Sequence, residues 1–270
     1  MKIAAIQMNS GDNKGKNIAK AKEFIDEAAK EGAGVIALPE MFNFLGPDRE
    51  KLSQAETIPG PTIQCMMDKA AEHKIYLLCG SILEKSEDSK RAFNTSVFLN
   101  PRGAIVAKYR KIHLFDIKIE GESLYRESAT IKPGTGVVIA NTDFAKLGLS
   151  ICYDLRFPEL YRKLATQGAQ IIFIPAAFTL QTGKDHWEPL IRARAIENQV
   201  YIIAPAQTDS HPPGEKCYGK SMIVDPWGIV LAKASDKEMV IYSEIDLLYQ
   251  NKVRKELPSL SHIRKDIFPL

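Results

Sequence analysis

The sequence has no pattern typical of a metal-binding or disulfide-stapled protein. Its 270 residues include four cysteines, Cys65, Cys79, Cys152 and Cys217, and no two of them form a CxxC pair. Their spacings match no zinc ribbon or zinc finger, and the five scattered histidines form no HExxH motif. We therefore expect free thiols, no metal site and no organic cofactor.

Long apolar runs and blocks of basic residues are also missing. No stretch approaches the roughly 18 apolar residues of a membrane span, and the N-terminal run MKIAAIQM lacks the length of a secretory signal. The 36 basic and 33 acidic side chains are dispersed along the chain and leave a net charge of only +3. This balance makes nucleic acid a poor candidate for a partner. We expect a cytoplasmic protein with neither a membrane nor a nucleic acid as its partner.

No Pro/Gly/Ser-rich linker or low-complexity segment divides the chain, so we expect a single domain over residues 1–270. Apolar, β-rich runs alternate with helical patterns, and the turn sequences NPRG (100–103), TDFAK (142–146) and DPWG (225–228) predict hairpins. About ten strands are too many for one open twisted sheet. The pattern therefore predicts an α/β fold of two packed mixed sheets with outer helices. The expected helices span residues 13–31, 61–73, 158–167, 186–198 and about 246–257.

Three chemically active side chains stand where predicted strands end. GVIALP ends in Glu40, AIVAKYR ends in Lys111, and LGLSI ends in Cys152. Ligands of α/β proteins gather beyond the carboxyl ends of strands, so the three groups could meet there. A thiol can attack a carbonyl, a carboxylate can move the proton, and an ammonium can stabilise the oxyanion. Together they predict acyl transfer at a cysteine.

Each of these residues also has a simpler interpretation. Glu40 could be a solvated loop residue or a helix cap, and Lys111 lies in the cluster KYRK, which is typical of a solvated face. Cys152 could be a buried small hydrophobe, as free cysteines commonly are. Spacing alone leaves these alternatives open.

The segments ALPEMF (37–42), YRKIHLFD (109–116) and GLSICYDLRFPEL (148–160) resemble the three signature blocks of the nitrilase superfamily of carbon–nitrogen hydrolases. The likeness extends over essentially the whole chain. It implies a four-layer αββα sandwich, a triad of Glu40, Lys111 and Cys152, and a homodimer or higher homo-oligomer. The segment RESATIKPG resembles the family's block with a second glutamate, which makes Glu127 a fourth member of the site.

The resemblance also implies the chemistry. The Cys152 thiol adds to an amide carbonyl, Lys111 and the backbone N–H of Tyr153 hold the oxyanion, and ammonia leaves. The resulting thioester is hydrolysed by a water that Glu40 activates. His113, close to Lys111, could line or shape the site, although a structural role is the simpler interpretation.

For the substrate, CYDLRFPEL and PAAFTLQTG resemble the branch of ω-amidases and deaminated-glutathione amidases. In that branch the residue matching Arg156 binds a carboxylate, and Phe178 and Thr182 match pocket positions. The simpler interpretation of Arg156 is a surface arginine or an ion pair. The resemblance thus implies a small carboxylate-bearing amide such as deaminated glutathione or α-ketoglutaramate.

Other interpretations stay open. A nitrilase or an N-carbamoyl amide hydrolase would use the same residues, and a binding or regulatory homologue would keep the scaffold without catalysis. Cys217, in a loop at 208–220, matches no pattern and is interpreted as incidental. The loop 119–125 is expected to frame the pocket mouth, and the tail 258–270 to pack on a neighbouring subunit.

Overall fold

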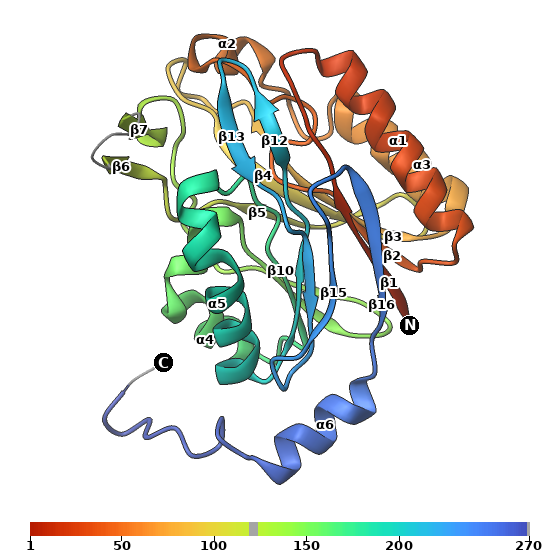
Figure 1. The fold of residues 1–270 in the computed structure, drawn as a ribbon, viewed down its shortest axis with the longest axis vertical. Coiled ribbons are helices and arrows are strands. Elements are labelled where there is room, and N and C mark those ends of the chain that lie inside the picture. The colour runs from red at the N-terminus through yellow and green to blue at the C-terminus, as the bar shows by residue number, and fades with distance from the viewer. Residues whose placement is uncertain (119–123, 269–270) are drawn as a thin grey trace.

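The computed structural model describes residues 1–118 and 124–268. Within these ranges the strands form two six-stranded mixed sheets that lie face to face, with helices on both outer sides (Figure 1). The first sheet has the order β16 (Met239–Glu244), β1 (Lys2–Gln7), β2 (Val35–Ala37), β3 (Tyr76–Glu84), β4 (Phe93–Leu99), β5 (Ile105–Arg110). The second has the order β15 (Val230–Lys233), β14 (Met222–Val224), β11 (Tyr201–Ala204), β10 (Ile171–Phe173), β9 (Lys146–Leu149), β8 (Ile139–Asn141).

Both sheets are parallel at the centre and antiparallel at the flanks. Strands β1, β2 and β3 pair in parallel, as do β9, β10 and β11. Because β4 is antiparallel to both β3 and β5, strand β5 runs in the same direction as β2. The carboxyl ends of β2 and β5 and the start of β4 therefore lie at one edge of the first sheet.

Four helices form the outer layers. α1 (Lys14–Lys30) and α3 (Pro61–His73) cover the first sheet, and α4 (Pro158–Thr166) and α5 (Leu180–Asn198) cover the second (Figure 1). The predicted αββα sandwich is thus confirmed. Smaller elements complete the described chain: α2 (Asp48–Gln54), α6 (Leu247–Glu256), the pairs β6 (Asp116–Lys118) with β7 (Leu124–Arg126) and β12 (Thr208–His211) with β13 (Glu215–Tyr218), and two 3₁₀ turns, η1 (Glu127–Ala129) and η2 (Cys152–Arg156).

The alternation of side chains along β1 builds two cores. Ile3 and Ala5 face the other sheet and join the core between the sheets. Ala4 and Ile6 face the opposite way and join the core beneath α1 and α3. Both faces of this strand are buried, which explains why the run reads as continuously apolar.

The three predicted hairpins are confirmed, because β4–β5, β8–β9 and β14–β15 are antiparallel pairs. The helix starts also follow their capping residues. The Asn13 side chain accepts the backbone N–H of Lys16 at the start of α1, and Asp246 accepts those of Leu248 and Tyr249 at the start of α6.

Two parts of the prediction are wrong. Helix α5 begins at Leu180 rather than at residue 186, because Thr182 and Gly183 are buried against β13 and stay helical. The segment 208–220 is not simply a loop, since it contains the β12–β13 hairpin. A short helix that was not expected, α2, lies between β2 and α3.

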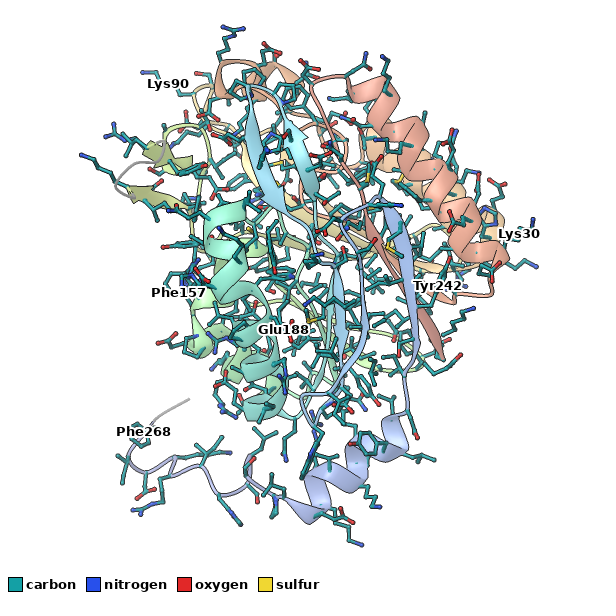
Figure 2. All side chains as sticks on the ribbon, in the orientation of Figure 1. Lys30, Lys90, Phe157, Glu188, Tyr242 and Phe268 are labelled. Carbon is teal, nitrogen blue, oxygen red and sulfur yellow. The ribbon has the colours of Figure 1, made fainter. Side chains whose placement is uncertain are left out.

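The end of the chain extends away from the two sheets. After α6 the segment from residue 257 to Phe268 runs along the outside of the sandwich, below the two sheets in the view of Figure 1 and Figure 2. Leu257, Ile267 and Phe268 are 51%, 55% and 64% exposed. No helix in the described ranges combines the length and the apolar character that crossing a membrane requires.

Candidate active site

The strand ends bring the three candidate residues together. Glu40, Lys111 and Cys152 all line one cavity of about 150 Å³ at the edge where β2, β5 and β9 end. Glu127 lines the same cavity. Three of these side chains come from the first sheet and its following loops, and Cys152 comes from the second. The site therefore lies between the two sheets.

Glu40 is a buried carboxylate with donors on both oxygens. Its Oε1 accepts from Nδ2 of Asn94 at 2.8 Å and from Nζ of Lys111 at 3.2 Å. Its Oε2 accepts the backbone N–H of Ala177 at 2.8 Å. Ala177 follows β10 and so belongs to the side of the second sheet. These bonds hold the carboxylate in one orientation between the sheets.

Lys111 forms an ion triad with two carboxylates. Its Nζ lies 2.8 and 3.0 Å from the two oxygens of Glu127 as well as 3.2 Å from Glu40. The side chain is 2% exposed. Burial alone would lower the pKa of Lys111, but the charges of Glu127 and Glu40 raise that pKa well above its ordinary value. The group is therefore an ammonium at neutral pH.

Cys152 occupies the sharp turn that the sequence indicated. Its backbone has a φ of +46°, in the left-handed region that non-glycine residues rarely adopt. Its N–H donates to the carbonyl of Pro175 at 2.9 Å, which ties the turn to the end of β10. Such strained residues persist where the surrounding structure holds them, and they cluster at functional sites.

The thiol of Cys152 lies beside the Glu40 carboxylate and the backbone N–H of Ala177, and both act on its pKa. Burial and the charge of Glu40 raise the pKa of this thiol well above its ordinary value, although Lys111 acts in the opposite direction. The resting side chain is therefore a protonated thiol beside a carboxylate, and attack on a carbonyl requires the proton to move.

The loop that carries Glu40 passes unusually close to β3. A Cβ at Gly80 would lie 1.9 Å from the carbonyl oxygen of Leu38 and 2.4 Å from that of Pro39. Gly80 lies at a register shift of β3, where only a residue without a side chain leaves room for the loop. Met41, directly after Glu40, has a φ of +53° and donates its N–H to Oγ of Ser81. Local backbone geometry thus sets the position of Glu40.

The predicted substrate residues divide into two groups. Tyr153, Phe178 and Thr182 line the cavity with Cys152. Arg156 is absent from the described lining, but its guanidinium lies 5.2 Å from the ring centroid of Phe178 and its Nη1 lies 3.2 Å from Nδ1 of His186. Arg156 therefore lies beside two lining residues, Tyr153 and Phe178.

His113 is also outside the lining. Its ring stacks on Phe157 with centroids 3.7 Å apart, and its Nδ1 lies 2.7 Å from Oδ1 of Asp154. His113 packs beside the turn that carries Cys152, which fits the structural interpretation.

Several residues around the cavity were not predicted from the sequence. Asn94, at the start of β4, contacts both carboxylates, and Ala177 supplies a backbone donor. Cys217 is buried in β13 and forms part of the cavity wall. The turn residues Pro212, Pro213 and Gly214, which separate 208–211 from 215–218, are a hairpin signal that could have indicated this wall. Of the loop 119–125, residues 119–123 lie outside the described ranges, and Leu124 and Tyr125 line the cavity.

Among the described residues, a cluster with metal-ligand spacing is found only away from the cavity. Asp26, Glu72 and His73 lie on α1 and α3, and Oδ1 of Asp26 already contacts Lys69 at 2.7 Å and His73 at 2.6 Å. This arrangement is satisfied as an ion-pair group between two helices.

The sandwich and its cysteine–glutamate–lysine cavity define a class of enzyme, the hydrolases of carbon–nitrogen bonds other than peptide bonds. The carbon–nitrogen hydrolase family model matches residues 2–255, and the chain belongs to this family. A deaminated glutathione amidase of Synechocystis sp. is 44% identical over 262 residues, covering 96% of each chain. The omega-amidase NIT2 of Homo sapiens is 40% identical over 267 residues, covering 99% of this chain and 96% of the relative.

Solved structures show the same fold. The NitFhit protein of C. elegans superposes with a TM-score of 0.93 at 40% identity, covering 98% of this chain, which spans 65% of that longer protein. Nit3 of Saccharomyces cerevisiae, a member of the nitrilase superfamily, superposes with a TM-score of 0.89 at 33% identity, covering 98% and 96% of the two chains. The predicted superfamily and its fold are confirmed.

Proposed function

We propose that this hydrolase cleaves a small carboxylate-bearing amide through a thioester on Cys152. The observation that carries the proposal is the contact of a protonated thiol, a carboxylate and an ammonium in one buried cavity. Each of these groups has one role in acyl transfer, as nucleophile, proton carrier and oxyanion partner.

The reaction begins with a proton transfer. As Sγ of Cys152 bonds to the carbonyl carbon, its proton passes to Glu40, because the raised pKa of the thiol leaves little thiolate in the resting enzyme. The carbonyl oxygen becomes an oxyanion, held by the Lys111 ammonium and the backbone N–H of Tyr153. Glu40 then gives the proton to the amide nitrogen, the C–N bond breaks, and ammonia or an amine leaves.

The thioester is removed by water. Glu40 takes a proton from the water while the water oxygen bonds to the acyl carbon. The second tetrahedral intermediate then expels the Cys152 thiolate. Glu40 returns the proton to sulfur, and the acid departs. Glu127, which contacts Nζ of Lys111 through both of its oxygens, keeps the ammonium in place through both steps.

The substrate class rests on the relatives and on the cavity. An amidase of deaminated glutathione and an omega-amidase are both about 40% identical over nearly the whole chain. A second cavity of about 620 Å³ adjoins the first and shares Tyr125, Thr179, Glu215 and Lys216 with it, so an amide with a substituent on nitrogen has room. Arg156, whose guanidinium lies beside the ring of Phe178, is the proposed carboxylate partner.

A substrate panel tests the function. Deaminated glutathione, α-ketoglutaramate, simple aliphatic amides, N-carbamoyl amino acids and aliphatic nitriles are each incubated with the wild-type chain and with Cys152→Ala. The released acid is the common readout, because an N-substituted amide releases an amine in place of ammonia. Hydrolysis of the carboxylate-bearing amides alone, lost in Cys152→Ala, supports the proposal. Preference for nitriles or carbamoyl compounds would assign one of those activities instead.

Thiol labelling separates an enzyme from a binding or regulatory homologue. Iodoacetamide should modify Cys152, which lines the cavity beside the Glu40 carboxylate that can take the thiol proton, and substrate should block this labelling. Cys65, on α3 and only partly buried, should be labelled without protection by substrate. Uniform slow labelling of the cysteines would favour an inert scaffold.

We further propose that residues 1–270 form a single domain and act in the cytoplasm as a homodimer or higher homo-oligomer. The exposed apolar residues of the tail, Leu257, Ile267 and Phe268, support packing of residues 258–270 on a neighbouring subunit. Light scattering of the full chain and of a chain ending at residue 257 tests this, with a smaller assembly expected for the truncated chain. Equal masses would contradict the role of the tail.

A further inference from the structure

Asn94 has more contacts with the catalytic groups than a structural residue needs. Its Nδ2 lies 2.8 Å from Oε1 of Glu40 and 3.4 Å from Oε1 of Glu127. Its backbone carbonyl accepts the N–H of Lys111 at 2.9 Å. One fully buried residue at the start of β4 therefore touches three of the four polar residues of the site.

The orientation of the Asn94 amide is set by these carboxylates. Its Oδ1 is buried and has no hydrogen-bond partner among the described residues. A buried unsatisfied oxygen is costly, and the amide would be expected to turn if its surroundings allowed it. Turning it, however, would point Oδ1 at two carboxylates and remove the donor to Glu40. The hydrogen bond from Asn94 to Glu40 is therefore kept although Oδ1 of the same amide has no partner among the described residues.

The two oxygens of Glu40 are not equivalent. Among the described residues, Oε1 accepts hydrogen bonds from Asn94 and from the Lys111 ammonium, whereas Oε2 accepts the backbone N–H of Ala177. Ala177, whose N–H is the donor to Oε2, also acts on the pKa of the neighbouring Cys152 thiol, so we take Oε2 as the oxygen on the thiol side. A proton leaving the thiol can be accepted at Oε2 without displacing the lysine.

We infer that Asn94 is a positioning residue, which holds Oε1 of Glu40 toward Lys111 and so presents Oε2 to the thiol of Cys152. The inference rests on the proposed role of Glu40 as the proton acceptor. Asn94 touches no reacting atom. Its effect passes through the orientation and protonation of Glu40.

Two substitutions separate positioning from simple packing. Asn94→Leu removes the donor and keeps a similar volume, and a carboxylate that loses a donor is more readily protonated. Asn94→Asp places a third carboxyl beside Glu40 and Glu127, which can donate only while it carries a proton. Asn43→Leu is the matched control, because Asn43 is also a buried asparagine. Its side-chain Nδ2 donates a hydrogen bond to Oγ1 of Thr62, and its Oδ1 has no partner among the described residues.

The readout is the rate of Cys152 alkylation by iodoacetamide between pH 5 and 9, followed by mass spectrometry, which needs no known substrate. We expect Asn94→Leu to lower the rate at pH 7 by about tenfold or more and to move the acid limb to higher pH. Asn94→Asp should be slow at neutral pH and recover as the pH falls. Asn43→Leu should keep the wild-type profile, with thermal melting used to confirm that each variant is folded.

Wild-type profiles in both folded Asn94 variants would overturn the inference. So would an equal loss in Asn94→Leu and Asn43→Leu, because that result would indicate packing alone. Failure of the proposed function is seen separately, as the absence of acid release from every compound of the panel by the wild-type chain.

Discussion

His113 and Asp154 are joined through a single carboxylate oxygen. The backbone N–H of His113 donates to Oδ1 of Asp154 at 3.1 Å, and the ring Nδ1 lies 2.7 Å from the same oxygen. Oδ2 accepts the hydroxyl of Tyr109 at 2.6 Å and the backbone N–H of Ile151 at 2.9 Å. The Asp154 carboxylate thus connects Tyr109 and His113, on either side of Lys111, to Ile151, which precedes Cys152. These bonds set the distance between the lysine and the thiol.

The first prediction concerns the Tyr109 bond. Tyr109→Phe should lower kcat about tenfold, because small displacements of catalytic groups are costly, while KM changes little. Tyr76→Phe is the matched control, since its hydroxyl makes the same 2.6 Å bond to Asp143 at a distance from the cavity. Both variants should lose about 1 kcal/mol in the free energy of unfolding. Equal kcat values in the two variants would show that the Tyr109–Asp154 bond does not position the site.

The second prediction concerns the ammonium. Lys111→Gln should lower kcat/KM by about 10²–10³-fold, the usual loss for one oxyanion donor. Lys108→Gln is the control, because Lys108 lies on β5, which ends just before Lys111, but pairs with Glu84. The kcat/KM of Lys108→Gln should stay within about threefold of wild type. Near-normal rates in a folded Lys111→Gln variant would show that the ammonium does not stabilise the oxyanion.

The third prediction concerns stability and pH. Burial alone would raise the pKa of Glu84, but hydrogen bonds from Arg110, Lys108 and Thr95 lower that pKa from 4.5 to about 2. A carboxyl with a lowered folded-state pKa stabilises the fold above its unfolded pKa and loses this contribution as the pH falls toward the folded value. Glu84→Gln should therefore reduce the free energy of unfolding by roughly 2 kcal/mol at pH 7, and by progressively less from about pH 5 to pH 2.

Urea unfolding at a series of pH values measures this difference. Glu256→Gln serves as the control, because its side chain is 63% exposed and lies 3.9 Å from Lys252. The control should change stability by less than about 0.5 kcal/mol at every pH. A difference for Glu84→Gln that does not vary between pH 2 and 7 would contradict the predicted role of the carboxylate.

The layered fold could be predicted because its signals are local. Turn sequences, capping residues and fully apolar runs act over a few residues, and the hairpin at 225–228 and the helix start at Asn13 follow from them. The start of α5 could not be predicted in the same way. Residues 180–185 are held helical by contacts with β13, about 35 residues later in the sequence.

The candidate site shows the same division. Glu40, Lys111 and Cys152 stand at strand ends, and the order of the strands brings them together. Asn94 begins a strand instead of ending one, and only the antiparallel placement of β4 brings it to that edge. Arg156 was predicted from its match to a family position, but the direction of a long side chain depends on neighbours such as His186 that spacing does not reveal.

The last prediction concerns Gly80, which lets the loop with Glu40 approach β3. A methyl group there would lie 1.9 Å from a backbone carbonyl oxygen, so either β3 or the loop must move. Gly80→Ala should cost about 2 kcal/mol or more in stability. It should also lower kcat more than tenfold, because Glu40 follows the displaced Leu38 and Pro39 directly. Gly136→Ala is the matched control, since a Cβ there meets nothing within 4 Å. Thermal melting and the amidase assay on both variants check this, and a folded Gly80→Ala with normal kcat would show that Glu40 keeps its position without the close approach of the loop to the strand.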